Sequence, residues 1–341
     1  MNKTFLSLVI ISLITINFSF AFQTSKAKKF AKTITEKELS EHLYTYASDE
    51  FEGRDTGAPG QKKAVEYIRN YYKSIGIEPG DLEGDYFQEM TLTMRGRRGQ
   101  KPKTVETENV IAIIRGSEKP DEYVVITAHL DHVGITDGEI YNGADDNGSG
   151  TTTVLEIAEA LAIAKNMGHS PRRSVLCLLV TGEEKGLLGS YYYSENPVFD
   201  VDKTVADVNI DMVGRVDKKY EDNPNYIYVI GSDRLSTDLH KINENANNTY
   251  AGLTLDYKYN DEKDPNRYYF RSDHYNFARL GIPSIFFFNG VHEDYHQPGD
   301  TVDKINFDKM QNVGRLIFHT IWDLANRNDR IEVDGKVKVG R

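Results

Sequence analysis

Residues 123–165 read YVVITAHLDHVGITDGEIYNGADDNGSGTTTVLEIAEALAIAK, and this stretch decides the fold class. It begins with a β-branched apolar run that ends at His129, a pattern typical of a buried strand. A Gly-rich loop over 141–150 then opens a helix over 148–165, in which apolar residues recur every three to four positions. A buried strand that leads into an amphipathic helix is the building unit of sheets flanked by helices.

The same alternation continues along the rest of the chain. Further apolar runs predict strands over 86–93, 108–115, 123–129, 174–181, 205–210, 226–230 and 284–288. Amphipathic spacing predicts helices over 37–46, 61–74, 148–165, 236–245 and 307–325. We therefore expect an α/β fold, a three-layer sandwich with a central mixed, largely parallel sheet flanked by helices. A single domain would span 22–341, with N-terminal helices over 34–75, a metal-binding core over 108–327 and a loose tail or weak edge strand at the end.

The first residues resemble a targeting segment. An uncharged, mainly apolar stretch from Thr4 to Gln23 follows Lys3, and Ser19 and Ala21 form a small-x-small cleavage pattern. This combination is typical of a removable signal peptide, which we place at residues 1–21. An uncleaved anchor is the alternative, because the stretch nearly reaches bilayer length, but Ser, Thr and Asn interrupt it. We expect an exported protein, periplasmic or secreted, without stable membrane association once the leader is removed.

Charge and cysteine content narrow the class of protein further. The net charge of −11 argues against nucleic acid or anionic membrane as a main partner, since both bind basic surfaces. The one basic run, over 95–103, is punctuated by Gly and Pro and is interpreted as an exposed hairpin loop. The single cysteine, Cys177, lies in a buried-strand pattern, so we expect a core residue and no intrachain disulfide.

Residues with metal-ligating side chains stand at the ends of the predicted strands or in the Gly-rich loop. They are His129 and Asp131, Asp145 and Asp146, Glu183 and Glu184, Asp211, and His296. Ligands of open α/β sheets bind at the carboxyl ends of the strands, so these side chains are expected to meet. Two histidines and several carboxylates suit two zinc ions held side by side. This pattern predicts metal-assisted hydrolysis.

Spacing alone leaves two of the roles open. Either Asp145 or Asp146 could use both carboxylate oxygens to bridge two metals, and either could instead cap the following helix. Glu183 and Glu184 are adjacent and would point in different directions if extended. One of the two can therefore bind a metal while the other acts as general base.

The neighbouring residues are interpreted as support for the site. Asp131 shares a face with His129 and is expected to hold the local structure around it. Asp211 interrupts an apolar run, and a buried carboxylate without a partner is costly, so a metal partner is expected there. Of the other seven histidines, His274 and His292 are the two that we expect near the pocket.

Five motifs occur in a fixed order between Glu108 and Asp303. They are His129-x-Asp131, Gly143-Ala-x-Asp146-Asn-x-Ser-Gly150, Gly182-Glu-Glu-x-Gly-Leu-x-Gly-Ser190, Asn209-x-Asp211-Met212 and Tyr295-His296-x-x-x-Asp300-Thr301. With these motifs the chain resembles the zinc metallopeptidases of family M28, in particular the secreted bacterial leucine-type aminopeptidases. The segment from Ser48 to Arg54 also resembles the N-terminal part of many members.

The resemblance implies two zinc ions as cofactors. One zinc would be bound by His129, Asp146 and Asp211, and the other by Asp146, Glu184 and His296. It also selects Asp146 as the bridge and implies a cis peptide bond between Asp146 and Asn147.

The resemblance also implies the catalytic groups. Glu183 would be the general base, and Tyr295 would donate a hydrogen bond to the developing oxyanion. The family's Ser-Asp-His segment appears at 272–274 and would form a wall of the pocket. Asp273 in that segment and Arg271 before it are the expected substrate contacts.

The implied function is a co-catalytic exopeptidase that removes the N-terminal residue from peptides with a free N-terminus. A carboxypeptidase or dipeptidase of the same superfamily is the first alternative. A carboxypeptidase would need a cation for the substrate carboxylate, for which Arg271 is the nearby candidate. A single-zinc glutaminyl cyclase lacks a full ligand set, and a non-enzymatic receptor-type module has no reason to keep a base beside intact ligands.

Overall fold

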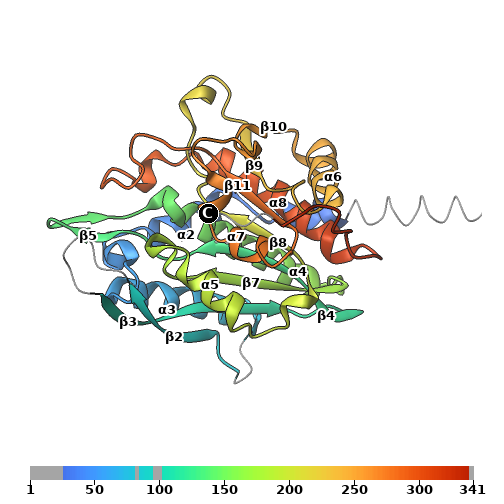
Figure 1. The fold of residues 1–341 in the computed structure, drawn as a ribbon, viewed down its shortest axis with the longest axis horizontal. Helices are drawn as coiled ribbons and strands as arrows, with labels where there is room; N and C mark the ends of the chain where they lie inside the picture. The colour runs from blue at the N-terminus through green and yellow to red at the C-terminus, as the bar shows by residue number, and fades with distance from the viewer. Residues whose placement is uncertain (1–25, 81–83, 95–101, 338–341) are drawn as a thin grey trace, which may run out of the picture.

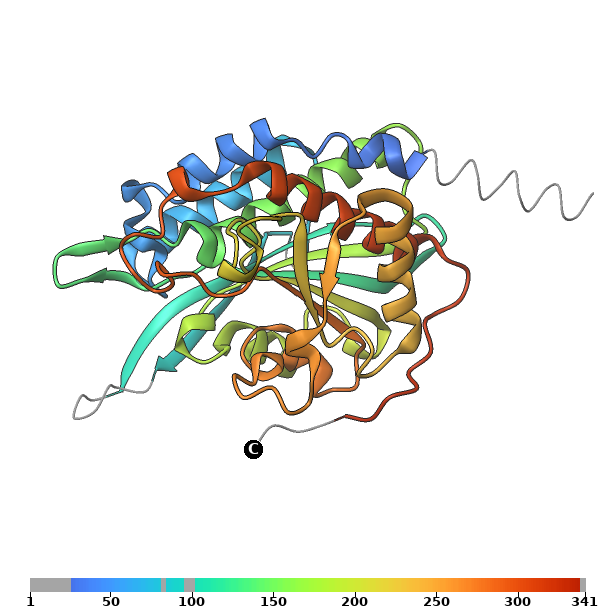
Figure 2. The ribbon, with the colours of Figure 1, turned by 90° about the horizontal axis from the view of Figure 1, so that it is seen from above.

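The computed structural model of the protein describes residues 26–80, 84–94 and 102–337. These residues form a nine-stranded mixed sheet with helices on both faces (Figures 1 and 2). The strand order is β1-β3-β7-β4-β8-β11-β9-β10, and β2 pairs with β3. The predicted α/β sandwich is therefore confirmed.

The centre of the sheet is parallel and its flanks are mainly antiparallel. Strands β7, β4, β8 and β11 are parallel neighbours, whereas β1, β2 and β7 pair antiparallel with β3, and β9 pairs antiparallel with β11. The strands are β1 (Glu78–Pro79), β2 (Phe87–Met94), β3 (Lys103–Ile114), β4 (Lys119–His129), β7 (Arg173–Val180), β8 (Thr204–Ile210), β9 (Tyr226–Ile230), β10 (Thr254–Asp256) and β11 (Ser284–Phe288). Every residue of β7 and β8 is buried, as strands covered on both faces require.

The helices divide unequally between the two faces of the sheet (Figure 2). On one face lie α2 (Glu36–Tyr46), α3 (Pro59–Ser74), α4 (Gly150–Asn166), α6 (Thr237–Ala246) and α8 (Phe307–Asn326). The shorter α5 (Leu188–Glu195) and α7 (His274–Ala278) cover the other face. Side-chain caps define several starts, since Thr35, Ser236 and Asn306 accept hydrogen bonds from the first turns of α2, α6 and α8.

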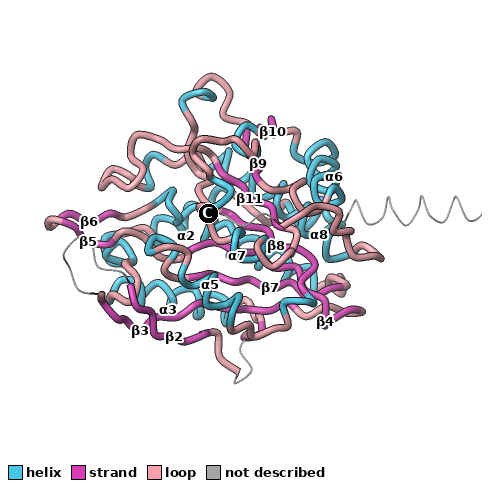
Figure 3. Tube along the Cα trace, in the orientation of Figure 1, coloured by secondary structure: helices cyan, strands magenta, loops and turns pink. Residues whose placement is uncertain are grey.

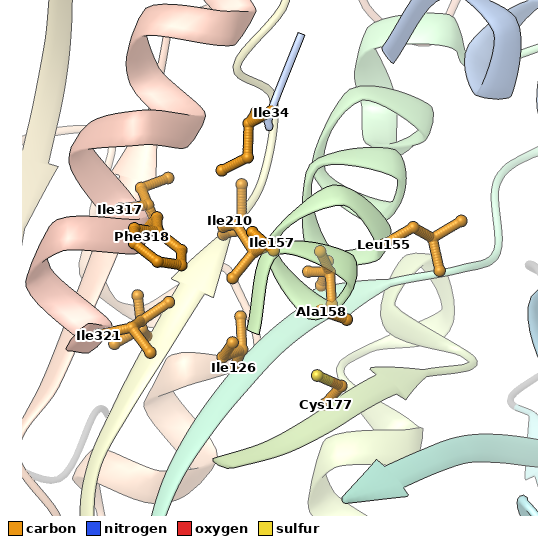
Figure 4. Packing of buried hydrophobic residues seen from close by; sticks show 14 of the residues in the cluster. Ile34, Ile126, Leu155, Ile157, Ala158, Cys177, Ile210, Ile317, Phe318 and Ile321 are labelled. Atoms are coloured by element: carbon orange, nitrogen blue, oxygen red, sulfur yellow. The ribbon is translucent and has the colours of Figure 1, made fainter. Parts of the chain in front are cut away.

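The main hydrophobic core lies between the sheet and the larger helical layer (Figure 4). Ile126 and Ile210 of the central strands meet Ile157 of α4 and Ile317 of α8 there, all fully buried. Burying one such side chain contributes about 1.5–3 kcal/mol relative to leaving it exposed. Cys177 is a free, buried thiol in this core, as predicted.

The hairpin of β5 (Gly134–Thr136) and β6 (Glu139–Tyr141), which extends away from the sheet, was not predicted (Figures 1 and 3). Three-residue strands are too short for a periodic signal. The turn nevertheless carries one, because Asp137 and Gly138 have φ of 54° and 85°, and Asp-Gly is a favoured pair for such a hairpin turn. Helix α5 was also unpredicted.

Several predictions fall on residues outside the described ranges. The signal peptide expected at 1–21 lies there, as does most of the basic loop, although β2 and β3 pair from Met94 and Lys103 onward as a hairpin would. Within the described residues no helix combines the length and apolarity needed to span a membrane. The described part of the tail, up to residue 337, contains no strand.

The parallel centre of the sheet determines where the polar strand ends meet. β4 ends at His129, β7 ends three residues before Glu183, and β8 ends directly before Asp211. β11 ends at Phe288, and the loop that follows carries His296. Because these four strands are parallel, their carboxyl ends lie at one edge of the sheet.

We predict that protonation of one buried histidine makes the fold sensitive to acid. His319 of α8 is buried and stacks on Tyr250, with ring centroids 3.7 Å apart. Burial, helped by the charges of Lys28 and Arg315, lowers the pKa of His319 to about 3. The unfolded chain binds this proton near pH 6.5, so stability is lost as pH falls below that value, by about 2 kcal/mol at pH 5.

The measurement is urea unfolding at pH 8 and pH 5. His319→Phe keeps a stacking ring but cannot be protonated, so its stability should fall by about 2 kcal/mol less than that of the wild type between these pH values. Parallel pH profiles for the two proteins would contradict the prediction.

Candidate metal centre

Two groups of ligating atoms converge at the carboxyl edge of the sheet and share Asp146. Asp146 Oδ1 lies 3.2 Å from His129 Nε2, and Asp211 Oδ1 lies 3.4 Å from the same nitrogen. Asp146 Oδ2 lies 3.0 Å from His296 Nε2, and Glu184 Oε1 lies 3.1 Å from it. Atoms bound about 2.0–2.1 Å from one tetrahedral zinc are roughly 3.3 Å apart. Each group therefore has the spacing that a bound metal ion requires.

The structure separates the roles of Asp145 and Asp146. Asp145 Oδ1 accepts hydrogen bonds from the backbone N–H of Gly214 and from Ser149, and its Oδ2 accepts one from Asn289. Asp145 therefore fixes the loop, while Asp146 faces both histidines. The peptide bond between Asp146 and Asn147 is cis, as the resemblance implies.

Asp131 supports His129 through its backbone carbonyl and not through its carboxylate. The backbone carbonyl of Asp131 contacts His129 Nδ1 at 3.1 Å, whereas its carboxylate stands 3.9 Å from that nitrogen. The carboxylate instead accepts hydrogen bonds from Thr56 and from the backbone N–H of Glu183. Asp131 thus ties the end of β4 to the start of the Glu183 turn.

Asp211 and the Asp146 loop also have dedicated partners. Ser272 donates a 2.7 Å hydrogen bond to Asp211 Oδ2, which leaves Asp211 Oδ1 to face His129. The carboxylate of Asp300 accepts hydrogen bonds from the backbone N–H groups of Asp145 and Asp146. Such support fixes the direction of each potential ligand.

A cavity opens onto one of the two groups. His129, Asp146 and Asp211 line it together with Glu183, whereas Glu184 and His296 do not. The rest of the lining is Tyr295, Arg271 and an apolar wall of Met212, Tyr268, Phe286, Phe288 and Val291. The site thus combines an acidic floor with an apolar pocket.

The two adjacent glutamates have opposite electrostatic environments. Burial raises the pKa of Glu183 well above its usual range, and the Glu184 charge adds to the rise against the opposing effect of His129. Burial also acts to raise the pKa of Glu184, but contacts with His132 and His296 outweigh it and hold that pKa at about 2. The two carboxylates are therefore suited to different tasks.

The two expected substrate contacts differ in position. Arg271 is exposed and lines the cavity, with its guanidinium 5.0 Å from the centre of the Tyr268 ring. Asp273 does not line the cavity. It is fully buried and accepts a 2.5 Å hydrogen bond from Ser190, which gives it a supporting position behind the wall. The expectation of direct substrate contact is therefore corrected for Asp273.

His132 was missed by the sequence reasoning, which assigned it to the core or the surface. It is fully buried, with Nδ1 3.0 Å from Glu184 Oε1 and 3.8 Å from Asp146 Oδ2. Together with those two carboxylates it forms a group that could hold a metal ion. Its position in the sequence could have indicated a role in the site, because it directly follows Asp131 and lies three residues after His129. His274 and His292, which were expected near the pocket, contact Phe286 and Asp145 respectively.

Arg54 was also missed, although it connects both loops of the centre. Its side chain is fully buried and donates hydrogen bonds to the backbone carbonyls of Tyr46, Leu130, Asn142 and Gly143, at 2.7–3.2 Å. Leu130 adjoins His129, and Gly143 lies three residues before Asp146. The guanidinium therefore holds the end of β4 and the Asp146 loop in one arrangement.

Comparison with known protein families gives one match, which covers most of the chain. Residues 109–321 match the model of peptidase family M28. Leupeptin-inactivating enzyme 1 of Streptomyces exfoliatus is 30% identical over 84% of the chain, and a probable leucine aminopeptidase of Arthroderma benhamiae is 28% identical over 77% of it. The chain spans 56% of the length of the Streptomyces relative, little more than half, and 71% of the other.

Solved structures share the fold at lower identity. The zinc aminopeptidase BSAP of Bacillus subtilis superposes with a TM-score of 0.65 at 17% identity, covering 89% of this chain and 99% of that one. A glutaminyl cyclase of Porphyromonas gingivalis superposes with a TM-score of 0.66 at 21% identity, covering 84% and 97%. These likenesses establish the fold and leave the activity to the residues of the site.

We predict that Arg54 supports metal binding as well as folding. In Arg54→Met the four carbonyls lose a charged donor, so stability should fall by about 3 kcal/mol and the zinc affinity at least about tenfold. Arg173 is the matched control, because it is also fully buried and donates to the carbonyls of Leu324, Arg327 and Asn328, at the opposite end of β7. Arg173→Met should lose similar stability without the loss in zinc affinity.

Chemical unfolding and competition with a zinc-binding dye measure the two quantities separately. Equal zinc affinities in the two variants would contradict the prediction.

Proposed function

The chain belongs to peptidase family M28, and from this membership we propose that it is a two-zinc exopeptidase that releases the N-terminal residue of peptides. One observation carries the proposal: the two oxygens of Asp146 face two separate groups of ligating atoms. A carboxylate with its two oxygens arranged in this way can hold two metal ions side by side, as two-metal hydrolases do.

The proposed ligands are the five residues that the resemblance indicates. His129, Asp146 and Asp211 would hold the first zinc, and Asp146, Glu184 and His296 the second. Imidazole nitrogens and carboxylate oxygens are ordinary zinc ligands, and the contact distances of 3.0–3.4 Å fit them. When bound, zinc supplies Lewis-acid polarisation of the carbonyl and lowers the pKa of water.

Glu183 is proposed as the general base. It lines the cavity beside His129 and Asp211, and Asp131 fixes its backbone through a 3.1 Å hydrogen bond. From this position its carboxylate would take a proton from the attacking water and pass it to the leaving amine. Glu184 does not line the cavity, and its Oε1 lies 3.1 Å from His296 Nε2. We therefore propose Glu184 as the metal ligand of the two glutamates.

Tyr295 is proposed to donate a hydrogen bond to the oxyanion that forms on the carbonyl. Its side chain lines the same cavity, and its ring stacks on His296 with centroids 3.9 Å apart. Stacking restricts where the hydroxyl can lie. A donor held in place before the reaction stabilises the developing charge without reorganisation.

Arg271 favours a second candidate, an exopeptidase that recognises a free C-terminus. Its exposed guanidinium at the cavity could pair with a substrate carboxylate. An amino-end enzyme instead needs a negative group for the substrate ammonium, and Glu183 and Asp211 both line the cavity. The acidic floor therefore favours recognition of the N-terminus.

The two candidates are separated with one peptide series. Blocking the amine by acetylation should lower kcat/KM at least about tenfold, because it removes a charge pair in a partly dry pocket. Amidation of the C-terminus should change kcat/KM much less. A strict need for a free C-terminus, with equal rates on free and acetylated peptides, would assign the activity to the other end of the substrate.

The adjacent glutamates should respond differently to the same substitution. Glu183→Gln removes the base but no ligand, so kcat should fall by about 10²–10⁴ while the zinc content stays unchanged. Glu184→Gln should lower zinc content as well as activity. Zinc content by plasma emission and kcat on an aminoacyl-p-nitroanilide give the two readouts, and the opposite pattern would reverse the assignment.

A further inference from the structure

We propose that His132 is a fourth protein ligand of the metal on the Glu184 side, so that the two metal positions are unequal. The position held by His132, His296, Asp146 and Glu184 would have four protein ligands. The position held by His129, Asp146 and Asp211 would keep an open place facing the cavity. This inference rests on the proposed two-zinc function and assigns separate tasks to the two ions.

The distances place His132 beside both carboxylates of the second group of ligating atoms, with which it could hold a metal ion. Glu184 Oε1 lies 3.0 Å from His132 Nδ1 and 3.1 Å from His296 Nε2. Asp146 Oδ2 lies 3.8 Å from His132 Nδ1 and 3.0 Å from His296 Nε2. These four separations scatter around the roughly 3.3 Å expected between ligands of one tetrahedral zinc.

The close approaches around Glu184 do not have the geometry of well-aligned hydrogen bonds. Among the described residues, Glu184 Oε1 has no hydrogen-bond partner, although two imidazole nitrogens lie about 3 Å from it. Both ring nitrogens of His132 also lack one. A buried carboxylate and a buried imidazole without partners are costly. Lone pairs of Glu184 Oε1 and His132 Nδ1 directed at a common metal ion, rather than at one another, account for the close approach of these two atoms.

His292 shows that burial beside a carboxylate is insufficient for such a group. Its Nε2 lies 3.2 Å from Asp145 Oδ2, and its ring nitrogens also lack hydrogen bonds among the described residues. Asp145 Oδ2, however, accepts a hydrogen bond from Asn289, and no second imidazole approaches it in the described contacts. His292 therefore contacts one carboxylate oxygen, Asp145 Oδ2, which already accepts a hydrogen bond. His132 instead lies near two carboxylates, those of Asp146 and Glu184.

The chain holds the His132 ring in this place from several sides. Its backbone N–H donates to the carbonyl of Arg54, and Asp55 forms a β-bridge with His132. Gly143 lies against the ring with φ of 55°, and a Cβ at this position would stand 2.5 Å from His132 Cγ. The absence of a side chain at Gly143 thus provides the space that the imidazole occupies.

The cavity supports the same asymmetry independently. It is lined by all three residues of the first position, but by neither His132, Glu184 nor His296. Sites with four protein ligands are typical of structural zinc, and sites with three and an open place are typical of catalytic zinc. Water and substrate would therefore meet the first metal, while the second would fix the bridging Asp146.

The direct test is zinc X-ray absorption on protein loaded with one equivalent of zinc. The position with four protein ligands should fill first and show two imidazole ligands. The first position offers one imidazole, His129, and the second position without His132 also offers one, His296. A count of one imidazole in the wild type would overturn the proposal.

Chelator titration tests the unequal affinities with matched variants. In the wild type one zinc should be retained at a chelator concentration that removes the other, with at least a tenfold difference in Kd. His132→Phe keeps a ring but no nitrogen, so the tighter Kd should rise at least tenfold and the imidazole count should fall from two to one. His292→Phe should retain both zinc affinities.

The proposal is overturned if His132→Phe keeps its tight zinc or if His292→Phe weakens zinc equally. Should His132→Phe fail to fold, the imidazole count of the wild type still decides the question. A protein that shows this metal asymmetry but cleaves no peptide would contradict the proposed function and leave the inference about His132 standing.

Discussion

The arrangement of the site depends on the concentration of negative charge in a place from which water is largely excluded. Asp146, Glu184 and Asp211 are all near the histidines, and Glu183 stands beside them. Two like charges 4 Å apart repel by about 4 kcal/mol at an effective dielectric constant of 20. Three neighbouring carboxylates without cations would push the loops apart. Cations and the backbone contacts of Arg54 oppose that repulsion, and the surrounding loops are built to hold the carboxylates in place.

Backbone conformation shows where the chain accepts strain to build this centre. Arg54, Met212 and His296 have φ of 52°, 60° and 54°, in the left-handed region that residues other than glycine avoid. Each costs of order 1–3 kcal/mol and persists when surrounding contacts determine it. Met212 adjoins Asp211, and His296 belongs to the second group of ligating atoms. Arg54 contacts the loops that carry His129 and Asp146, and its own hydrogen bonds anchor it. Within the described residues, the α-helices and the nine-stranded sheet contain no such residue other than glycine, and they supply the rigid frame.

Sequence patterns predicted the fold better than the detailed site. β9 and β11 were predicted at both ends, because short apolar runs bounded by polar residues mark strands buried on both faces. β3 and β4 begin four to five residues earlier than predicted, since most of their first residues are polar and interrupt the apolar pattern. Arg54 and His132 were missed for a tertiary reason. The partners of Arg54 lie up to 89 residues away, and no local pattern reveals such contacts.

The different environments of Glu183 and Glu184 follow from one turn. Gly182 precedes them with φ of 68°, and residues 183–185 then form a single 3-10 turn instead of continuing β7. Successive side chains on such a turn point about a third of a revolution apart. One carboxylate therefore reaches the cavity while the next contacts His132 and His296. In an extended chain the side chains of Glu183 and Glu184 would point to opposite faces of the sheet. The turn after Gly182 therefore keeps both carboxylates in one acidic centre while giving each a different set of partners.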